Sequence, residues 1–245
     1  MQKLQFVYLN RIAMKFDQYT ELRASGDGII SYGLFRRSSQ LISLVEREIS
    51  DGNLTKLRIV DFGCYDGAMM TKLSQRYSDI CETAIGFDIF PHGQPEDIEE
   101  HKIHFIKWDL HQQMPYPLDD GSQNLLIASA FFKHHRSPEK FLRECDRILS
   151  KDGVLIMLDP RCWVVRIGFL FKYFIKKDNT NLWHKSSVED LIAKCGLENS
   201  LEVSHYEPYW VAPNKKLFDL GLENLMPVFL KRFLSLHQSI VIKKR

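Results

Sequence analysis

The 245-residue chain lacks the patterns that mark several classes of protein. Its five cysteines form no C-x-x-C pair and no zinc-like spacing with histidine, which predicts a reduced, cytoplasmic protein without a structural metal. No run approaches the ~20 consecutive apolar residues of a membrane-spanning helix, and charges near the N-terminus interrupt any signal-peptide core. A net charge of +2, from 33 basic and 31 acidic residues, argues against a general nucleic-acid footprint.

What the chain does have is an apolar content of 44%, which suits one α/β domain with insertions. Its most informative stretch is residues 57–73, LRIVDFGCYDGAMMTKL. The β-branched and aromatic residues at its start predict a buried strand, and Gly63 and Gly67 bracket a tight turn. A helical pattern follows, with Asp66 as the expected N-cap. Together these form half of a nucleotide-type βαβ unit, in which backbone N–H groups face a ligand.

The charges beside this turn indicate which ligand it takes. A dinucleotide fingerprint, G-x-G-x-x-G/A, needs a second glycine where the backbone approaches a pyrophosphate, and Tyr65 occupies that place. Asp61 and Asp66 flank the turn, and a carboxylate about 4 Å from a phosphate is repelled by roughly 4 kcal/mol at an effective dielectric of ~20. The same carboxylates suit an ammonium and a sulfonium. The turn therefore favours S-adenosylmethionine over NAD.

Residues 61–67, DFGCYDG, resemble the D-x-G-C-G-x-G loop of the class I S-adenosylmethionine-dependent methyltransferases. The departure is Tyr65, where the family usually has the glycine that passes closest to the cofactor. The resemblance implies an α/β fold: a Rossmann-like, doubly wound, seven-stranded sheet, mostly parallel with an antiparallel last strand, plus helical lid insertions. It also implies that five loop residues bind the cofactor: Asp61, Gly63, Cys64, Tyr65 and Gly67.

Residues at the ends of the next strands complete the predicted cofactor site. Asp88 ends a predicted strand about 20 residues beyond the glycine turn, where a ribose-binding carboxylate is expected. It could accept hydrogen bonds from two ribose hydroxyls, each worth roughly 1.5–3 kcal/mol; a surface aspartate at a strand end is the alternative. The resemblance implies that Ile89 packs on adenine and that Asp109 binds the adenine amino group. Leu110 and Ala130, which end the third and fourth predicted strands, belong to the same expected set.

A second specific signal lies in residues 131–158, FFKHHRSPEKFLRECDRILSKDGVLIML. This stretch resembles the H-x-x-x-P-E-K-F-L-R-E…R-I-L-x-x-G-G-x-L segment of small-molecule methyltransferases such as those of quinone biosynthesis. His134 matches the family's recurrent histidine and His135 its frequent neighbour, near where the methyl group should emerge. Either could act as a general base. The alternative is a structural role in closing the turn before the helix.

The predicted organisation is a single methyltransferase domain over residues 1–245. Its expected parts are an N-terminal helical lid (1–52), a Rossmann-like core (53–206) with a cap insertion (160–180), a second cap (207–236), and a last strand with a basic tail (237–245). Four aromatic residues of the lid and caps are candidate acceptor contacts, with packing as the alternative: Tyr19, Tyr32, Trp163 and Trp210. Residues 161–177 are apolar and basic without an acid, which is typical of a helix on an anionic membrane surface or of a lid over an apolar pocket.

The predicted function is methyl transfer from S-adenosylmethionine to a small-molecule or lipid-like acceptor, with S-adenosylhomocysteine as product. The turn after the fourth strand is not N/D-P-P-Y/F and no Pro-Cys nucleophile is present, so methylation of DNA bases is not expected. Three alternatives stay open: a binding protein that has kept the fold and lost turnover, an RNA methyltransferase acting through a local basic patch, and an NAD(P)-dependent oxidoreductase, which Tyr65 and Asp66 disfavour.

Overall fold

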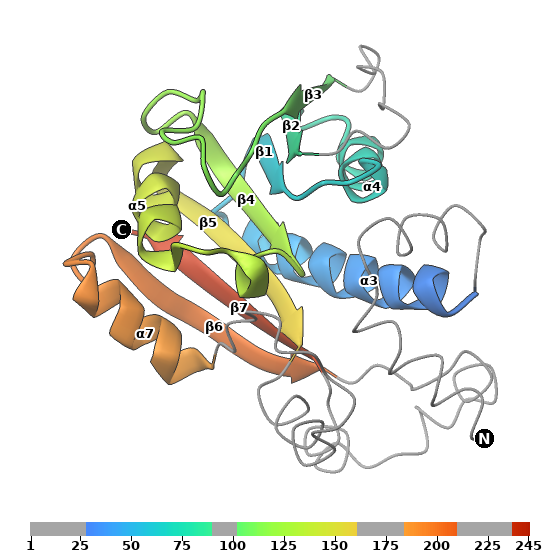
Figure 1. Cartoon of the computed structure of the whole chain (residues 1–245). Coiled ribbons are helices and arrows are strands. Elements are labelled where there is room, and N and C mark those ends of the chain that lie inside the picture. The colour runs from blue at the N-terminus through green and yellow to red at the C-terminus, as the bar shows by residue number, and fades with distance from the viewer. Residues whose placement is uncertain (1–27, 90–101, 161–183, 210–236) are drawn as a thin grey trace, which may run out of the picture.

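The computed structural model describes residues 28–89, 102–160, 184–209 and 237–245. They form a seven-stranded sheet in the order β3-β2-β1-β4-β5-β7-β6 (Figure 1). Neighbouring strands from β3 to β5 pair in parallel, whereas β7 pairs antiparallel with both β5 and β6. The strands are β1 Leu57–Phe62, β2 Cys81–Asp88, β3 Ile103–Lys107, β4 Gln123–Ser129, β5 Leu149–Pro160, β6 Leu201–Tyr209 and β7 His237–Lys244. The predicted Rossmann-like sheet with an antiparallel last strand is confirmed.

The order of the strands fixes where a ligand binds. The chain runs outward from β1 through β2 to β3 and then returns to β4 on the other side of β1. In open α/β sheets, ligands bind outside the carboxyl ends of the strands at the point where this order reverses. The loops that follow β1, β2 and β4 therefore meet at the expected position of a ligand.

Helices cover both faces of the sheet (Figure 1). On one face, α3 Gly28–Ser50 and α4 Ala68–Arg76 pack apolar side chains against the central strands. On the other face lie α5 Pro138–Ile148 and α7 Lys185–Lys194. Because each central strand is buried on both sides, its sequence is an almost continuous apolar run rather than an alternating one.

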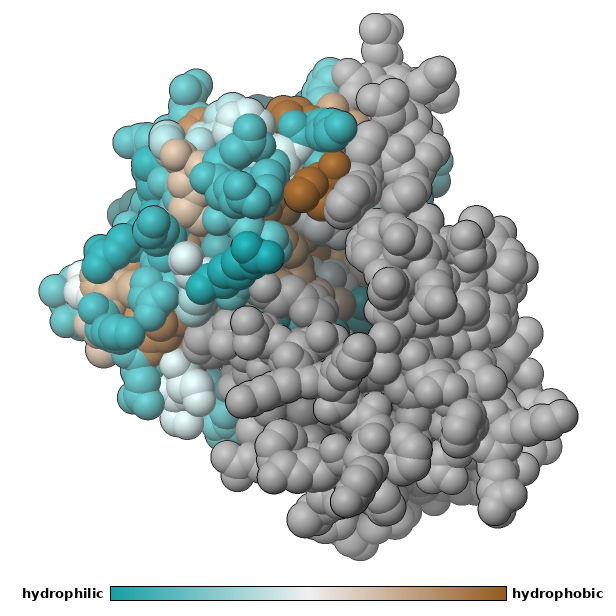
Figure 2. Space-filling model, viewed as in Figure 1, coloured by the Kyte–Doolittle hydropathy of each residue, from teal (hydrophilic) through white to brown (hydrophobic). Residues whose placement is uncertain are grey.

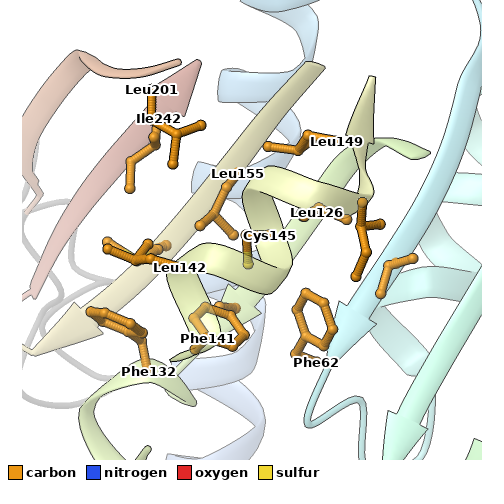
Figure 3. Packing of buried hydrophobic residues seen from close by; sticks show 14 of the residues in the cluster. Phe62, Leu126, Phe132, Phe141, Leu142, Cys145, Leu149, Leu155, Leu201 and Ile242 are labelled. Carbon is orange, nitrogen blue, oxygen red and sulfur yellow. The ribbon is translucent and has the colours of Figure 1, made fainter. Parts of the chain in front are cut away.

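Helix α5 shows how the sequence builds this layer. Pro138 stands at its first turn, where a missing N–H costs nothing. Its apolar residues recur on one side of the helix and are fully buried: Phe141, Leu142, Cys145 and Ile148. Figure 3 shows the first three directed at Phe62, Leu126 and Leu155 of the sheet. Burying each large apolar side chain contributes roughly 1.5–3 kcal/mol, so this face fixes α5, and the loop before it, on the sheet.

The start of α4 differs from the prediction. The N-cap is Gly67, with a left-handed φ of 70°, rather than Asp66. Asp66 still accepts a hydrogen bond at 3.1 Å from the backbone N–H of Ala68, so it satisfies one of the donors at the helix start. The prediction was wrong by one residue because the turn needs a positive φ at the capping position, which glycine adopts without strain.

Several predicted features lie outside the described residues. They include Tyr19, Trp163, Trp210 and residues 161–177. Tyr32 belongs to α3, but its side chain is not among those described. No helix in the described part of the chain is long and apolar enough to cross a membrane. On the face seen in Figure 2, the described surface is mainly hydrophilic, with apolar residues in separate patches.

Candidate functional site

The loop after β1 is held against the end of β2 by backbone and side-chain hydrogen bonds. The backbone N–H groups of Gly63 and Cys64 both donate to the carbonyl oxygen of Phe87, at 2.8 and 3.1 Å. The backbone N–H of Tyr65 donates to Oδ2 of Asp88 at 2.8 Å. The glycine turn and the predicted ribose carboxylate are therefore parts of one hydrogen-bonded unit.

Both glycines of the turn are required by their surroundings. Gly63 and Gly67 have φ values of 75° and 70°, in the left-handed region that favours glycine. A Cβ at Gly63 would lie 3.1 Å from Cδ2 of Phe131, and a Cβ at Gly67 would overlap the ring of Phe105. Two aromatic rings, from the loop after β4 and from β3, thus pack directly on the backbone of the turn.

Tyr65 keeps the backbone shape of a glycine turn although it is not glycine. Its φ is 54°, which costs an L-residue roughly 1–2 kcal/mol. The hydrogen bond from its N–H to Asp88 helps to hold this conformation. Tyr65 in place of glycine therefore leaves the backbone path of the turn intact, at the cost of a strained φ at Tyr65.

Three carboxylates surround the turn. Burial is the main reason why the pKa of the Cys64 thiol is raised, and the negative charges of Asp61, Asp88 and Asp66 raise it further. Asp61 is itself only 3% exposed. The turn consequently lies in a negative potential, which repels a pyrophosphate and attracts an ammonium or sulfonium group. Geometry and charge agree with the ligand preference inferred from the sequence.

The predicted adenine side of the site follows β2 and β3. Ile89 comes directly after Asp88 and, at 38% exposed, is the one large hydrophobic residue exposed among the described residues. Oδ1 of Asp109 accepts the backbone N–H groups of His111 and Gln112, at 2.9 and 3.2 Å. Asp109 therefore also shapes its own turn. Leu110 is buried, at 4% exposed.

His135 is built into the core beneath this turn. Its side chain is fully buried; Nδ1 accepts the backbone N–H of Ser137 at 3.1 Å, and Nε2 donates to the carbonyl oxygen of Leu110 at 3.0 Å. Burial lowers the pKa of His135 to about 4. His135 is thus held in one neutral tautomer, and its basic nitrogen, Nδ1, already accepts a hydrogen bond. These contacts favour a structural role for His135 over that of a general base. His134 ends the short 3-10 helix η2 Phe132–His134, and its side chain is not among those described.

Ala130 directs the chain from β4 back over the glycine turn. It has a left-handed φ of 57°, and its N–H donates to the carbonyl oxygen of Leu158 at 2.8 Å. The next residue, Phe131, packs on Gly63 and stacks with Phe62, with 6.3 Å between ring centroids. Ala130 therefore links the glycine turn to the end of β5.

Sequence reasoning missed a group of charged and polar residues beside Ala130. At the carboxyl end of β5, Arg37 of α3 and Lys133 of η2 each influence two residues electrostatically: Asp159 of β5 and His237 of β7. We call these four residues the charged cluster. The only local signal was an aspartate at the end of an apolar strand, because the four residues come from elements far apart in the chain.

Comparison with known proteins shows what this chain is similar to. Residues 60–157 match the family model of a methyltransferase domain. Magnesium protoporphyrin IX methyltransferase from Synechocystis, solved with bound S-adenosylhomocysteine, is 14% identical, with a TM-score of 0.57 over 98% of this chain and 94% of that one. An S-adenosylmethionine-dependent methyltransferase from Mesorhizobium loti is 14% identical, with a TM-score of 0.52 over 78% and 92%. No curated protein matches the sequence.

Residues 60–157 thus match a methyltransferase domain, and the fold is shared with solved S-adenosylmethionine-dependent methyltransferases. The matched span contains the glycine turn, Asp88, Asp109 and Ala130. The fold that this resemblance implied is confirmed, and the match over residues 60–157 agrees with the family that the sequence resembles.

Proposed function

We propose that the protein transfers the methyl group of S-adenosylmethionine to a small-molecule or lipid-like acceptor. The observation that carries this proposal is the acid-flanked glycine turn, whose Tyr65 N–H is held by Asp88 at the carboxyl edge of the sheet. Such a turn accepts a positively charged methyl donor and disfavours a dinucleotide. When bound, the donor supplies a methyl group activated on a sulfonium.

The residues of the turn fit this cofactor. Asp88 would hold the ribose hydroxyls, and Ile89 offers exposed apolar surface to the adenine. Asp61 and the backbone of the turn would face the charged methionine end. Holding donor and acceptor in line is worth roughly 7–11 kcal/mol in such a reaction, so the main task of the chain is to position the two reactants.

Three features of the sequence support a small or apolar acceptor. The loop after β4 lacks the N/D-P-P-Y/F turn used on exocyclic amines of bases. The net charge of +2 gives no general attraction to nucleic acid. Residues 161–177 supply many apolar side chains and no acid, as expected of a segment that covers an apolar acceptor or rests on a membrane surface.

Two measurements on the full-length chain test this function. Isothermal titration calorimetry should show binding of both S-adenosylmethionine and S-adenosylhomocysteine. Incubation with methyl-labelled S-adenosylmethionine and an organic-solvent extract of cells should then move label into a small molecule. A folded protein that binds neither ligand would be a non-catalytic relic of the fold, and label found in RNA instead would assign a different acceptor.

A further inference from the structure

The charged cluster lies where β4, β5 and β7 meet. Asp159 is the residue after Leu158, whose carbonyl oxygen accepts the N–H of Ala130. His237 begins β7 and pairs in register with Pro160, the residue after Asp159. Lys133 belongs to η2, three residues beyond Ala130. The charged cluster is therefore next to the loop after β4, whose Phe131 packs on the glycine turn. Asp88 and Ile89 lie beyond β1 in the opposite direction along the sheet.

Asp159, the acid of the charged cluster, is buried and forms no ion pair within the described residues. Asp159 is 4% exposed, and neither of its carboxylate oxygens has a partner with full hydrogen-bond geometry within the described residues, although the backbone N–H of Lys133 is near enough to lower the pKa of Asp159. The buried Nδ1 of His237 has no partner there either. The described part of the chain likewise shows no ion pair within 4.0 Å between Asp159 and either Arg37 or Lys133, although both cations influence it.

A purely structural ion pair would look different. Arg147 of α5 contacts Asp120 at 2.7 Å and Glu144 at 2.8 Å, so its charge is paired directly. Burying a charge costs several kcal/mol, and attraction offsets that cost only when the partners touch and their remaining hydrogen-bonding positions are filled. A buried carboxylate without a partner of good geometry calls for an explanation, such as a catalytic role or a bound water or ion.

The charged cluster is close enough to the glycine turn for a group bound at one to react with a group bound at the other. Strand β5 lies two strands from β1, or ~10 Å across the sheet at the usual strand spacing. Phe131 lies between the charged cluster and the glycine turn, because it follows Ala130 and its ring packs on Gly63. A methyl donor held by the turn and an acceptor held by the cluster would meet beside Ala130.

We infer that the charged cluster binds the reacting group of the acceptor, that this group is an acidic hydroxyl such as a phenol or enol, and that Asp159 takes its proton. This inference rests on the proposed methyltransferase function and narrows it to methylation at oxygen. Burial lowers the pKa of Lys133 and the charge of Asp159 opposes that fall. In their charged forms Lys133 and Arg37 stabilise the negative charge that develops on the acceptor oxygen. A protonated amine would instead meet two cations and only one carboxylate.

The reaction balances without a further reactant. The acceptor oxygen attacks the methyl carbon, a new O–CH₃ bond forms, and the CH₃–S bond breaks with its electron pair left on sulfur. The hydroxyl proton passes to the carboxylate of Asp159. Burial raises the pKa of Asp159 to about 6, with the charges of Lys133 and Arg37 opposing the rise, so the carboxylate is ionised and able to accept a proton above neutral pH. Burial lowers the pKa of His237 to about 3, and the same two cations lower it further, so His237 stays neutral.

The test uses 4-nitrophenol as the hydroxyl probe and 4-nitroaniline as a neutral amine of the same shape. With the full-length protein saturated with S-adenosylhomocysteine, 4-nitrophenol should bind with a rise in phenolate absorbance, and at least tenfold more tightly than 4-nitroaniline. Lys133→Met should weaken 4-nitrophenol binding at least tenfold, because it removes a cation that stabilises the phenolate. Asp159→Asn should keep that binding and lower the rate of S-adenosylhomocysteine formation from S-adenosylmethionine and 4-nitrophenol by at least about 100-fold.

Asp152→Asn is the matched control, since Asp152 is a 54%-exposed aspartate in the same strand. It should behave as wild type in every assay. Calorimetry with S-adenosylhomocysteine separates this inference from the proposed function, because each cluster variant should bind the cofactor product as wild type does. The inference is overturned if cofactor binding is intact and 4-nitrophenol does not bind, if 4-nitroaniline binds as tightly, or if Lys133→Met and Asp159→Asn match wild type.

Discussion

The carboxylate of Asp88 has two roles in the proposed cofactor site. Its Oδ2 accepts the N–H of Tyr65 at 2.8 Å, and the same carboxylate is the predicted partner of the ribose hydroxyls. A hydrogen bond to a charged group contributes roughly 1.5–3 kcal/mol, so losing two bonds to ribose costs at least about 3 kcal/mol. Asp88→Ala should therefore weaken S-adenosylhomocysteine binding by more than about 100-fold.

Asp88→Asn separates the two roles of this residue. The amide keeps a carbonyl oxygen for the Tyr65 N–H but lacks the negative charge. It should retain the shape of the turn and lose about tenfold to thirtyfold in affinity, since hydrogen bonds to neutral acceptors are about half as strong as charge-assisted ones.

Calorimetry on the full-length variants measures both effects, with circular dichroism to show that each is folded. Asp79→Asn is the control, because Asp79 is an exposed aspartate at the other end of the same βαβ unit. Binding by Asp88→Ala within threefold of wild type would refute the placement of the ribose at this carboxylate.

Three further predictions concern stability, each measured by chemical denaturation. Gly67→Ala should lower the free energy of unfolding by about 2–4 kcal/mol, because its φ of 70° is strained for alanine and the new Cβ overlaps Phe105; an unchanged midpoint would contradict this. Phe141→Ala should cost about 3–5 kcal/mol by opening a cavity under α5, and a loss below about 1 kcal/mol would argue against the packing in Figure 3. The pKa of Asp159 is raised from 3.8 to about 6, so its contribution to stability is present below pH 4 and is lost as pH rises through 6. The free energy of unfolding should fall by about 3 kcal/mol over this range. Asp159→Asn should abolish this loss, and an identical pH dependence in both proteins would contradict the prediction.

The sequence predicted the parts of the site that are local in the chain. The glycine turn, Asp88 and Ile89 follow directly from two strands and the loops at their ends, and a strand–glycine–helix pattern restricts the backbone closely. Even there the observed N-cap is one residue after the predicted one. Whether Asp66 or Gly67 caps the helix depends on φ, which composition alone does not give.

The other parts depended on packing. A histidine such as His135 looks like a base in sequence, and only its burial and the partners of both ring nitrogens distinguish a core histidine from a catalytic one. Arg37 and His237 are 200 residues apart, and the position of β7 between β5 and β6 brings them close enough to interact electrostatically. No spacing rule in a single sequence brings such residues together, so the charged cluster became visible only in the fold.

The central claim is that the acid-flanked turn prefers a positively charged methyl donor to a phosphate-bearing cofactor. Calorimetric titration of the full-length protein with S-adenosylmethionine and, in parallel, with NAD tests it most directly. We predict binding of S-adenosylmethionine and no heat of binding with NAD at millimolar concentration. Uptake of NAD by a protein that ignores S-adenosylmethionine would contradict the claim.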